Sequence, residues 1–400
     1  MLSNYKRIGD YIELVDERNT DLSIDLLLGL TVEKRFIPSV ANTVGTNMKN
    51  YKIIRKNQFA CSTMQVRRDK KMPVAILKDF DKAIISQAYP IFQVVDETLL
   101  NPDYLMMWFT REEFDRQATF HAVGGVRGSL EWEDFLDFEL PIPSIEKQRE
   151  IVNEYNTVTR RIQLNEQLNQ KLEATAQALY RHWFVDFEFP NEEGKPYKSS
   201  GGAMVYNEEL DKEVPEGWEV KSLSEVAEIS AGGDKPKVFS EQKTKENEIP
   251  IFSNGVTNNG LYGFTNKANY PKDSITISAR GTIGFSVLRK EPFDAIVRLL
   301  VLTPKFNNLS IYLWHTIKLI EFDNSGSVQN QLTKPQIANI YILIASSNIL
   351  EKYQSVENKF YKQINNQIKQ SQLLANFQSV LLSKMSTVEE RLENEKMGVG

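Results

Sequence analysis

Apolar residues recur at intervals of three and four positions in two long stretches of the chain. In the first stretch, from Ile145 to about Phe184, they are Ile151, Tyr155, Val158, Ile162, Leu168, Leu172, Ala176, Leu179 and Trp183. In the second stretch they are Leu350, Tyr353, Phe360, Ile364, Leu374, Phe377, Leu381 and Met385. This spacing predicts two long α-helices, each with one apolar stripe of the kind found in coiled-coil seams.

Neither helix can bury its stripe alone, and the chain between them is long enough for a globular module. The economical arrangement is one antiparallel pair of helices with a module at each end. Ser144 is the expected N-cap of the first helix, and Pro190 ends the region. Asn165 interrupts the first seam, and Gln367 and Ser371 are expected to lie opposite it, where polar residues fix the register at some cost in stability.

The rest of the chain predicts short strands and few helices. Runs rich in β-branched and aromatic residues are separated by Gly, Asn and Asp turns. Helical patches are expected at Asp103–Arg116 and Ser310–Glu321, and the polar segment Asn191–Met204 is expected to mark the junction of the two halves. The predicted strands are Tyr51–Ile54, Val74–Ile76, Ile91–Val95, Ile275–Ile277, Phe285–Leu288 and Ile296–Leu302.

The two halves of the chain also resemble each other. Val126–Pro143 aligns with Val328–Ala345 at an offset of 202 residues, which places Leu130 on Leu332 and Phe138 on Ile340. The prediction is an α/β (α+β) fold with an internal pseudo-twofold repeat, in which a long antiparallel two-helix coiled coil separates two mixed α/β modules. We expect modules at 1–144 and 189–345, long helices at 145–188 and 346–388, and an acidic tail at 389–400.

Composition limits the class of protein. The chain has 400 residues, of which 41% are hydrophobic and 25% charged, as expected for a globular protein of two or three domains. One cysteine, Cys61, and three histidines give neither a disulfide framework nor a zinc cluster. Since no apolar leader and no window of about 18 apolar residues is present, we expect a cytoplasmic protein with no membrane contact.

The net charge of −5 hides an uneven distribution. Between Lys34 and Lys78 there are eleven Lys and Arg residues against one acid, Asp69, and a weaker basic window runs from Ile249 to Lys290. Two basic faces on an acidic chain indicate two local sites for an anionic partner. The alternative is an ordinary solvated surface of strands and loops.

Several segments resemble one known family. LPIPSIEKQREIVNEY (Leu140–Tyr155) and LEATAQALYRHWFVDFEFP (Leu172–Pro190) resemble the central region of the specificity subunit of Type I restriction-modification systems. Further similarity to the family's target-recognition domains lies in Leu27–Ser39, Val126–Phe135, Ile249–Phe264, Thr276–Phe285 and Ser325–Ile337. The first module departs from the pattern, because CSTMQVRRDKK (Cys61–Lys71) stands near the place of the Ala279–Gly284 signature ARGTIG.

The resemblance implies a non-catalytic subunit that selects the DNA sequence on which partner subunits act. Each recognition domain would read one half of a bipartite target in double-stranded DNA. Two methylation subunits, which bind S-adenosylmethionine and methylate adenine at N6, would dock on the helices. Restriction subunits that use ATP and Mg²⁺ would join through the methylation subunits, and this chain itself would hold no cofactor.

The candidate DNA contacts are basic and amide side chains beside glycine turns. Arg reads guanine and Asn or Gln reads adenine, while Lys contacts phosphates. Each of these residues also has a simpler interpretation: Arg280 as a surface turn, the asparagines as turn formers, and the glutamines as loop solvation. The candidates are Lys34, Arg35, Lys49, Arg67, Arg68, Lys70, Arg127, Asn254, Asn258, Asn259, Arg280, Thr282, Gln329, Asn330 and Gln331.

Two other classes of function are open from the sequence. An adenine methyltransferase should carry an Asp/Asn-Pro-Pro-Tyr/Phe tetrad, but Asn101-Pro102-Asp103-Tyr104 lacks the second proline and predicts the first turn of a helix. The chain has no glycine-rich nucleotide loop, and His121, His182 and His315 are too scattered for a catalytic triad. A coiled-coil scaffold without a nucleic-acid role is the other class, and salt-dependent retention on DNA would distinguish it.

Overall fold

The computed structural model describes residues 5–39, 45–124, 128–322 and 331–385. The chain forms two compact units. Unit 1 contains residues up to Asn165 and from Ile368 onward, and unit 2 is Glu166–Gln367. Both units therefore include part of each long helix, α5 (Ile145–Tyr180) and α9 (Ser347–Lys384).

Unit 1 is built around a four-stranded antiparallel sheet in the order β2-β9-β6-β7. Rings of Phe59 on β6 and Phe92 on β9 stack at 5.0 Å between centroids, and Phe109 and Phe135 pack around them. Burying such a ring contributes about 1.5–3 kcal/mol. The elements of unit 1 before α5 are β1 (Tyr5–Arg7), β2 (Ile12–Val15), β3 (Leu28–Leu30), β4 (Phe36–Pro38), β5 (Lys52–Arg55), β6 (Phe59–Cys61), α1 (Val66–Asp69), β7 (Val74–Ile76), β8 (Lys82–Ile85), β9 (Ile91–Val94), α2 (Pro102–Phe109), α3 (Glu112–His121), α4 (Trp132–Leu136) and β10 (Glu139–Pro141).

Unit 2 contains an antiparallel sheet of the same kind, in the order β14-β20-β17-β18. Its elements between the long helices are β11 (Met204–Asn207), β12 (Lys212–Pro215), β13 (Glu219–Ser222), α6 (Leu223–Val226), β14 (Ala227–Ala231), β15 (Ile249–Phe252), η4 (Thr257–Gly260), β16 (Leu261–Thr265), β17 (Ser274–Ile277), β18 (Ser286–Arg289), β19 (Asp294–Ala295), β20 (Leu300–Pro304), α7 (Ser310–Leu319), α8 (Lys334–Ala338) and β21 (Tyr341–Ile344).

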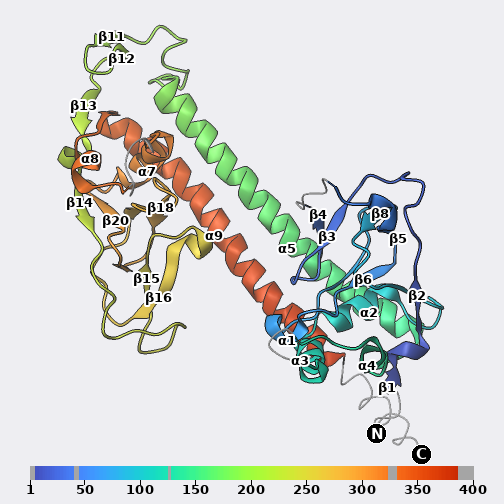
Figure 1. The fold of residues 1–400 in the computed structure, drawn as a ribbon. Coiled ribbons are helices and arrows are strands. Elements are labelled where there is room, and N and C mark those ends of the chain that lie inside the picture. The colour runs from blue at the N-terminus through green and yellow to red at the C-terminus, as the bar shows by residue number, and fades with distance from the viewer. Residues whose placement is uncertain (1–4, 40–44, 125–127, 323–330, 386–400) are drawn as a thin grey trace, which may run out of the picture. The chain divides into compact units, whose positions relative to one another are not determined.

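The internal repeat is visible in matching contacts of the two units. Helix α2 packs on β7 in unit 1. In unit 2, α7 packs on β18 (Figure 1). Tyr104 on α2 donates its hydroxyl to the carbonyl of Pro141, and Tyr312 on α7 does the same to Leu343. The predicted fold class, two mixed α/β modules with long helices, is confirmed.

The two long helices pair in opposite directions within each unit. In unit 1, Asn165 Nδ2 donates to Gln370 Oε1 and Ser371 Oγ, both at 3.2 Å, and Gln378 Nε2 donates to Thr159 Oγ1. In unit 2, the rings of Tyr180 and Trp183 pack on Tyr353. The expected contact of Asn165 with the Ser371 region is thus confirmed.

The predicted seam was wrong at two positions. Leu168 and Phe377 are 45% and 48% exposed, whereas Asn165, Asn169 and Gln367 are buried or half-buried. These polar residues continue the three-and-four spacing, whereas Leu168 and Phe377 each lie one residue away from a position of that spacing. The middle of the seam is therefore polar.

One local expectation also needs correction. The helix predicted at Asp103–Arg116 is two helices, since α2 ends at Phe109 and Thr110 Oγ1 bonds the carbonyl of Met107. The segment Asn191–Met204 is packed within unit 2, where the Tyr197 ring stacks on Phe189 at 4.5 Å. Asn101 does begin a helix, because its side chain accepts from the amides of Asp103 and Tyr104. Among the described helices, none is long and apolar enough to cross a membrane.

Candidate nucleic-acid interface

Equivalent strands of the two sheets are joined by loops that lie in equivalent places. Loop 62–73 joins β6 to β7 in unit 1, and loop 278–285 joins β17 to β18 in unit 2. The amide of Leu130 donates to Thr63 O at 2.9 Å, and the amide of Leu332 donates to Ala279 O at 2.9 Å. The segment that precedes the short helix α4 or α8 therefore meets its loop in the same way in both units. The CSTMQVRRDKK segment takes the place of ARGTIG.

The loop of unit 2 presents Arg280 and Thr282 to solvent. It closes tightly, because the amide of Gly284 donates to Ser278 O at 3.0 Å. Gly284 has φ +83°, and a Cβ there would lie 2.5 Å from Cδ2 of Phe322, so only glycine fits. Arg280 Nη2 donates to Gln331 Oε1 at 2.8 Å, which places these two candidate residues together.

Asn254 is a brace for this loop. Its Nδ2 donates to Val297 O at 2.7 Å, and its Oδ1 accepts from the amide of Ala279 at 2.7 Å. Because its Nδ2 and its Oδ1 both bond backbone groups of the protein, Asn254 positions the loop that carries Arg280.

Asn258 and Asn259 form an exposed turn in η4, with φ of +49° and +54°. Arg289, which belongs to the basic window from Ile249 to Lys290, fixes the position of this turn. Its buried guanidinium donates to Asn259 O at 2.7 Å and to Thr276 Oγ1 at 2.9 Å, and lies 3.5 Å from the centre of the Phe252 ring. Burial lowers the pKa of Arg289 to about 9.

In unit 1, Arg67 occupies a position comparable to that of Arg280. Its side chain is exposed, its amide donates to Gly128 O at 3.2 Å, and its Nη1 donates to Gly124 O at 3.2 Å. Arg68 pairs with Asp69 at 2.6 Å, and Lys70 is exposed. Each unit thus carries an exposed loop arginine that contacts the segment before the short helix.

Lys34 lies inside unit 1. Its Nζ pairs with Asp115 Oδ1 at 2.8 Å, bonds the carbonyl of Phe109 and lies 5.0 Å from the Phe114 ring centre. Burial lowers the pKa of Lys34, although the hydrogen bond to Asp115 acts in the opposite direction. Asp115 also accepts from the amide of Met72 at 3.1 Å, so this pair anchors loop 62–73.

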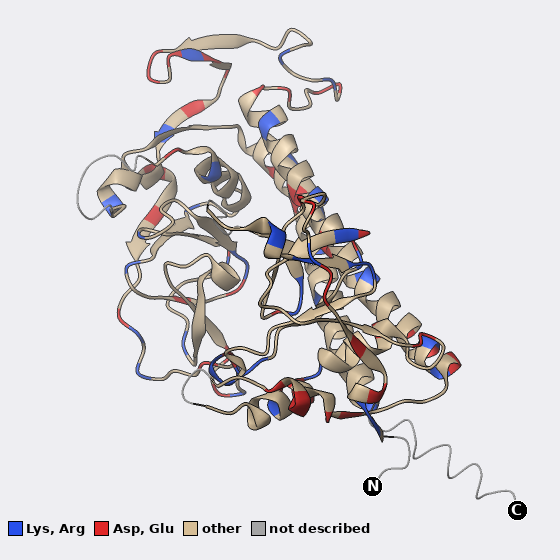
Figure 2. Ribbon diagram, turned by 45° about the vertical axis from the view of Figure 1, so that its right-hand side comes forward, with Lys and Arg blue, Asp and Glu red and all other residues tan. Residues whose placement is uncertain are grey.

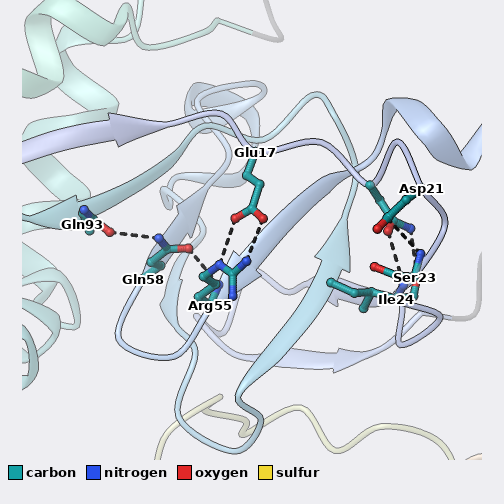
Figure 3. A network of polar contacts seen from close by, with 8 residues as sticks. Glu17, Asp21, Ser23, Ile24, Arg55, Gln58 and Gln93 are labelled. Carbon is teal, nitrogen blue, oxygen red and sulfur yellow. Dashed lines mark hydrogen bonds and ion pairs between the residues drawn. The ribbon is translucent and has the colours of Figure 1, made fainter.

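The first basic window is less positive than its sequence indicates. Arg55 forms two hydrogen bonds with Glu17, beside the contact of Gln58 with Gln93 (Figure 3). Lys52 and Lys78 pair with acids outside the window, and Figure 2 shows acidic segments interspersed among the basic ones. The basic residues of this window that have no ion pair with a described residue are Arg35, Lys49, Lys56, Arg67, Lys70 and Lys71, all of them exposed.

Three candidates, Arg127, Gln329 and Asn330, lie outside the described residues. Among the residues that are described, no group of three or more His, Cys, Asp and Glu side chains could hold a metal ion. His315 is buried, and its Nε2 lies 3.6 Å from Oε2 of Glu357, while His182 is exposed. Cys61 is buried, and burial raises the pKa of its thiol.

Comparison with known proteins gives a consistent result. A family model for the Type I restriction modification DNA specificity domain matches residues 32–174 and 215–371. The Type I restriction enzyme MjaIX specificity subunit of Methanocaldococcus jannaschii is 27% identical over 310 residues, covering 73% of this chain and 69% of that protein. The HindI specificity subunit of Haemophilus influenzae is 22% identical over 395 residues, covering 80% of this chain and 84% of that protein.

The fold has been observed before. The crystal structure of the S subunit of a Type-I restriction-modification system from M. genitalium matches this chain with a TM-score of 0.56. The match covers 96% of this chain and 95% of that chain at 16% sequence identity, which shows a shared fold.

Proposed function

Because this chain belongs to the family of Type I restriction modification DNA specificity domains, we propose that it recognises a bipartite sequence in double-stranded DNA, one half-site for each unit. Specificity subunits of this family are the non-catalytic components of their systems. The two matched ranges, 32–174 and 215–371, correspond to the two repeats. The proposed recognition domains are residues 1–144 and 189–345, with long helices at 145–188 and 346–388.

The observation that carries this proposal is the duplicated loop site. Arg67 and Arg280 are exposed on loops that join equivalent strands, and both loops receive the same backbone hydrogen bond from the segment before the short helix. An arginine fork beside glycine turns can reach a base edge while the backbone approaches a phosphate. A duplicated arrangement of this kind fits a target with two halves.

The proposed DNA contacts are the exposed candidates. In unit 2 they are Asn258, Asn259, Arg280 and Thr282, together with the half-buried Gln331 that Arg280 bonds, and Arg289 and Asn254 are positioning residues. Gln329 and Asn330 keep this role as a prediction, as does Arg127 in unit 1. Lys34 is assigned to support of the loop. In unit 1 the exposed candidates are Arg35, Lys49, Arg67, Arg68 and Lys70.

The proposed partners follow from the family. Two methylation subunits would supply S-adenosylmethionine and the methyl transfer, and restriction subunits would add ATP and Mg²⁺ chemistry through them, in the cytoplasm. Among the apolar residues of the long helices, Val152 is buried in the core of unit 1 and Leu382 packs against that core, so neither is free for a partner. Leu164 is 57% exposed and remains available for a partner.

DNA binding by the assembled complex tests the proposal. Arg280→Ala should weaken specific binding by about 1–3 kcal/mol if the arginine reads a base, and should lower the salt slope with a smaller loss if it contacts only phosphate. Arg67→Ala should behave alike. Lys198→Ala, which removes an equal charge from an exposed site before β11, is the control. Binding that is unchanged in both arginine variants at every salt concentration would favour a scaffold without DNA recognition.

A further inference from the structure

Phe120, in the last turn of α3, is unusually exposed. Its side chain is 84% accessible, the largest fraction among the exposed large hydrophobic residues that the structure describes. A phenylalanine left in water forgoes the free energy that burial of its ring would contribute. Single exposed apolar residues are common, so the surroundings of the ring decide whether it has a function.

Those surroundings are basic. Phe120 lines a hollow of about 700 Å³ together with Arg67 and Lys70 of loop 62–73, and the cations Lys71 and Arg116 line it too. Of the two acids in its wall, Asp115 pairs with Lys34 and accepts from the Met72 amide, and Glu112 lies 3.7 Å from Arg116. Arg116 also pairs with Glu113 at 3.2 Å, whereas Arg67, Lys70 and Lys71 have no ion pair with a described residue. The hollow therefore keeps a positive charge, and it includes the loop that we propose contacts DNA.

The sequence of unit 2 has no aromatic residue in the connection that corresponds to the one containing Phe120. The matching sequences Glu113-Phe114-Asp115 and Glu321-Phe322-Asp323 align the two units at Phe114 and Phe322. Leu130 lies 16 positions after Phe114, whereas Leu332 lies 10 positions after Phe322. Phe120 lies within the longer connection, and the residues between Phe322 and Leu332 include no aromatic side chain in the sequence.

We propose that Phe120 inserts its ring at a base step of the half-site bound by unit 1, while Lys70 and Lys71 contact the flanking phosphates. This inference rests on the proposed function. Apolar side chains that enter a base step are placed next to cations that hold the backbone, and an aromatic ring stacks on any base. The three cations of the hollow that have no ion pair with a described residue, Arg67, Lys70 and Lys71, fit phosphates better than they fit the apolar centre of a protein interface.

The test uses the complex of the full chain with its methylation subunits. Phe120→Ala should weaken DNA binding about tenfold or more, because stacking on one base is lost. The salt slope should stay the same, since the ring carries no charge. Phe120→Trp should retain binding. Phe306→Ala, which removes a ring that is 59% exposed in unit 2, is the matched control and should have no effect.

A fluorescent base locates the insertion. With 2-aminopurine placed in turn at each position of the target, the unmodified complex should raise the emission at one step of a single half-site, and Phe120→Ala should abolish that rise. Equal affinity of Phe120→Ala and Phe306→Ala, or an unchanged emission pattern, would overturn the inference. Loss of a methylation subunit from the Phe120→Ala complex in native mass spectrometry would also overturn it, by making the ring a protein contact.

The loop arginines separate this inference from the proposed function. If Arg67→Ala and Arg280→Ala weaken binding while Phe120→Ala does not, only the insertion is wrong. If the two arginine variants also bind like the unmodified complex, the proposed DNA recognition itself is wrong.

Discussion

Lys34 and Arg67 show that two basic residues of one sequence window can have different roles. Lys34 is buried against Asp115, and Arg67 is exposed on the loop that this pair anchors. Lys34→Met should lower the free energy of unfolding of unit 1 by about 3 kcal/mol, because it leaves a buried carboxylate without its cation. Arg67→Ala should leave that free energy within about 0.5 kcal/mol.

Denaturant unfolding of the two variants, with salt titrations of DNA binding by the folded complexes, measures this difference. Lys34→Met should keep the salt slope and Arg67→Ala should reduce it. A stable Lys34→Met variant with a reduced salt slope would show instead that Lys34 contacts the nucleic acid.

At this scale the sequence predicted residue types better than roles. Lys34, Arg55 and Lys78 pair with acids that lie 81, 38 and 25 positions away along the chain, so a window of local charge cannot detect them. Arg289 stood among surface charges in sequence but is buried under the Asn259 turn. Through-space pairing and burial depend on the fold, which the local sequence does not contain.

Among the elements, Asn165 carries the clearest prediction. Its side chain is buried in the seam and bonds Gln370 and Ser371. Asn165→Leu should raise the free energy of unfolding of the helix pair by about 1 kcal/mol, because it adds buried apolar surface. The same change should loosen the register, because a polar seam residue penalises shifted alignments.

A disulfide between Thr159→Cys and Gln378→Cys, whose native side chains are hydrogen bonded, reports the register. Cys61 is buried and should not compete. The fraction of this disulfide should fall in the Asn165→Leu background, while a pair of cysteines one helical turn away gains. Unaltered stability together with an unaltered disulfide yield would show that Asn165 does not determine the register of the helices.

The helices and strands were the most predictable part of the fold. The three-and-four spacing gave both long helices nearly to their ends, and Val74–Ile76 is the strand β7 as predicted. The seam was less predictable, since a search for apolar residues selects Leu168 and Phe377 and passes over Asn165 and Gln367. Buried polar positions keep the helical phase but have no apolar signature.

For the whole molecule, the length of the helices is proposed to set the distance between the half-sites. Inserting four residues near Asn165 and four near Gln367 adds about 6 Å, close to two base pairs at about 3.4 Å each. The extra helix rotation of about 40° and the DNA rotation of about 70° differ by an amount that coiled-coil twist can absorb. The preferred spacer should lengthen by about two base pairs, with both half-sites unchanged.

A methylation assay on targets with varied spacers measures this shift. The control is insertion in one helix only, which should bulge that helix and weaken assembly. A folded, active double-insertion variant with the original spacer would show that helix length does not determine the spacing.

The equivalence of the two loop sites could be predicted only in part. The offset of 202 residues aligns Leu130 with Leu332, and the structure gives both the same hydrogen bond. The same offset cannot align loop 62–73 with loop 278–285, because insertions change the spacing between the strands. The order of the strands in the two sheets shows which loops correspond. Phe120 lies in the connection that contains α3, which is longer than the corresponding connection of unit 2.

Mapping methylated adenines in a host genome that expresses this chain with its partner subunits tests the central claim most directly. The account predicts a motif with two fixed half-sites and a constant number of unspecified base pairs between them. Arg280→Ala should relax one half of that motif and leave the other half fixed. A single uninterrupted motif, or relaxation of both halves by this one change, would contradict recognition of one half-site by each unit.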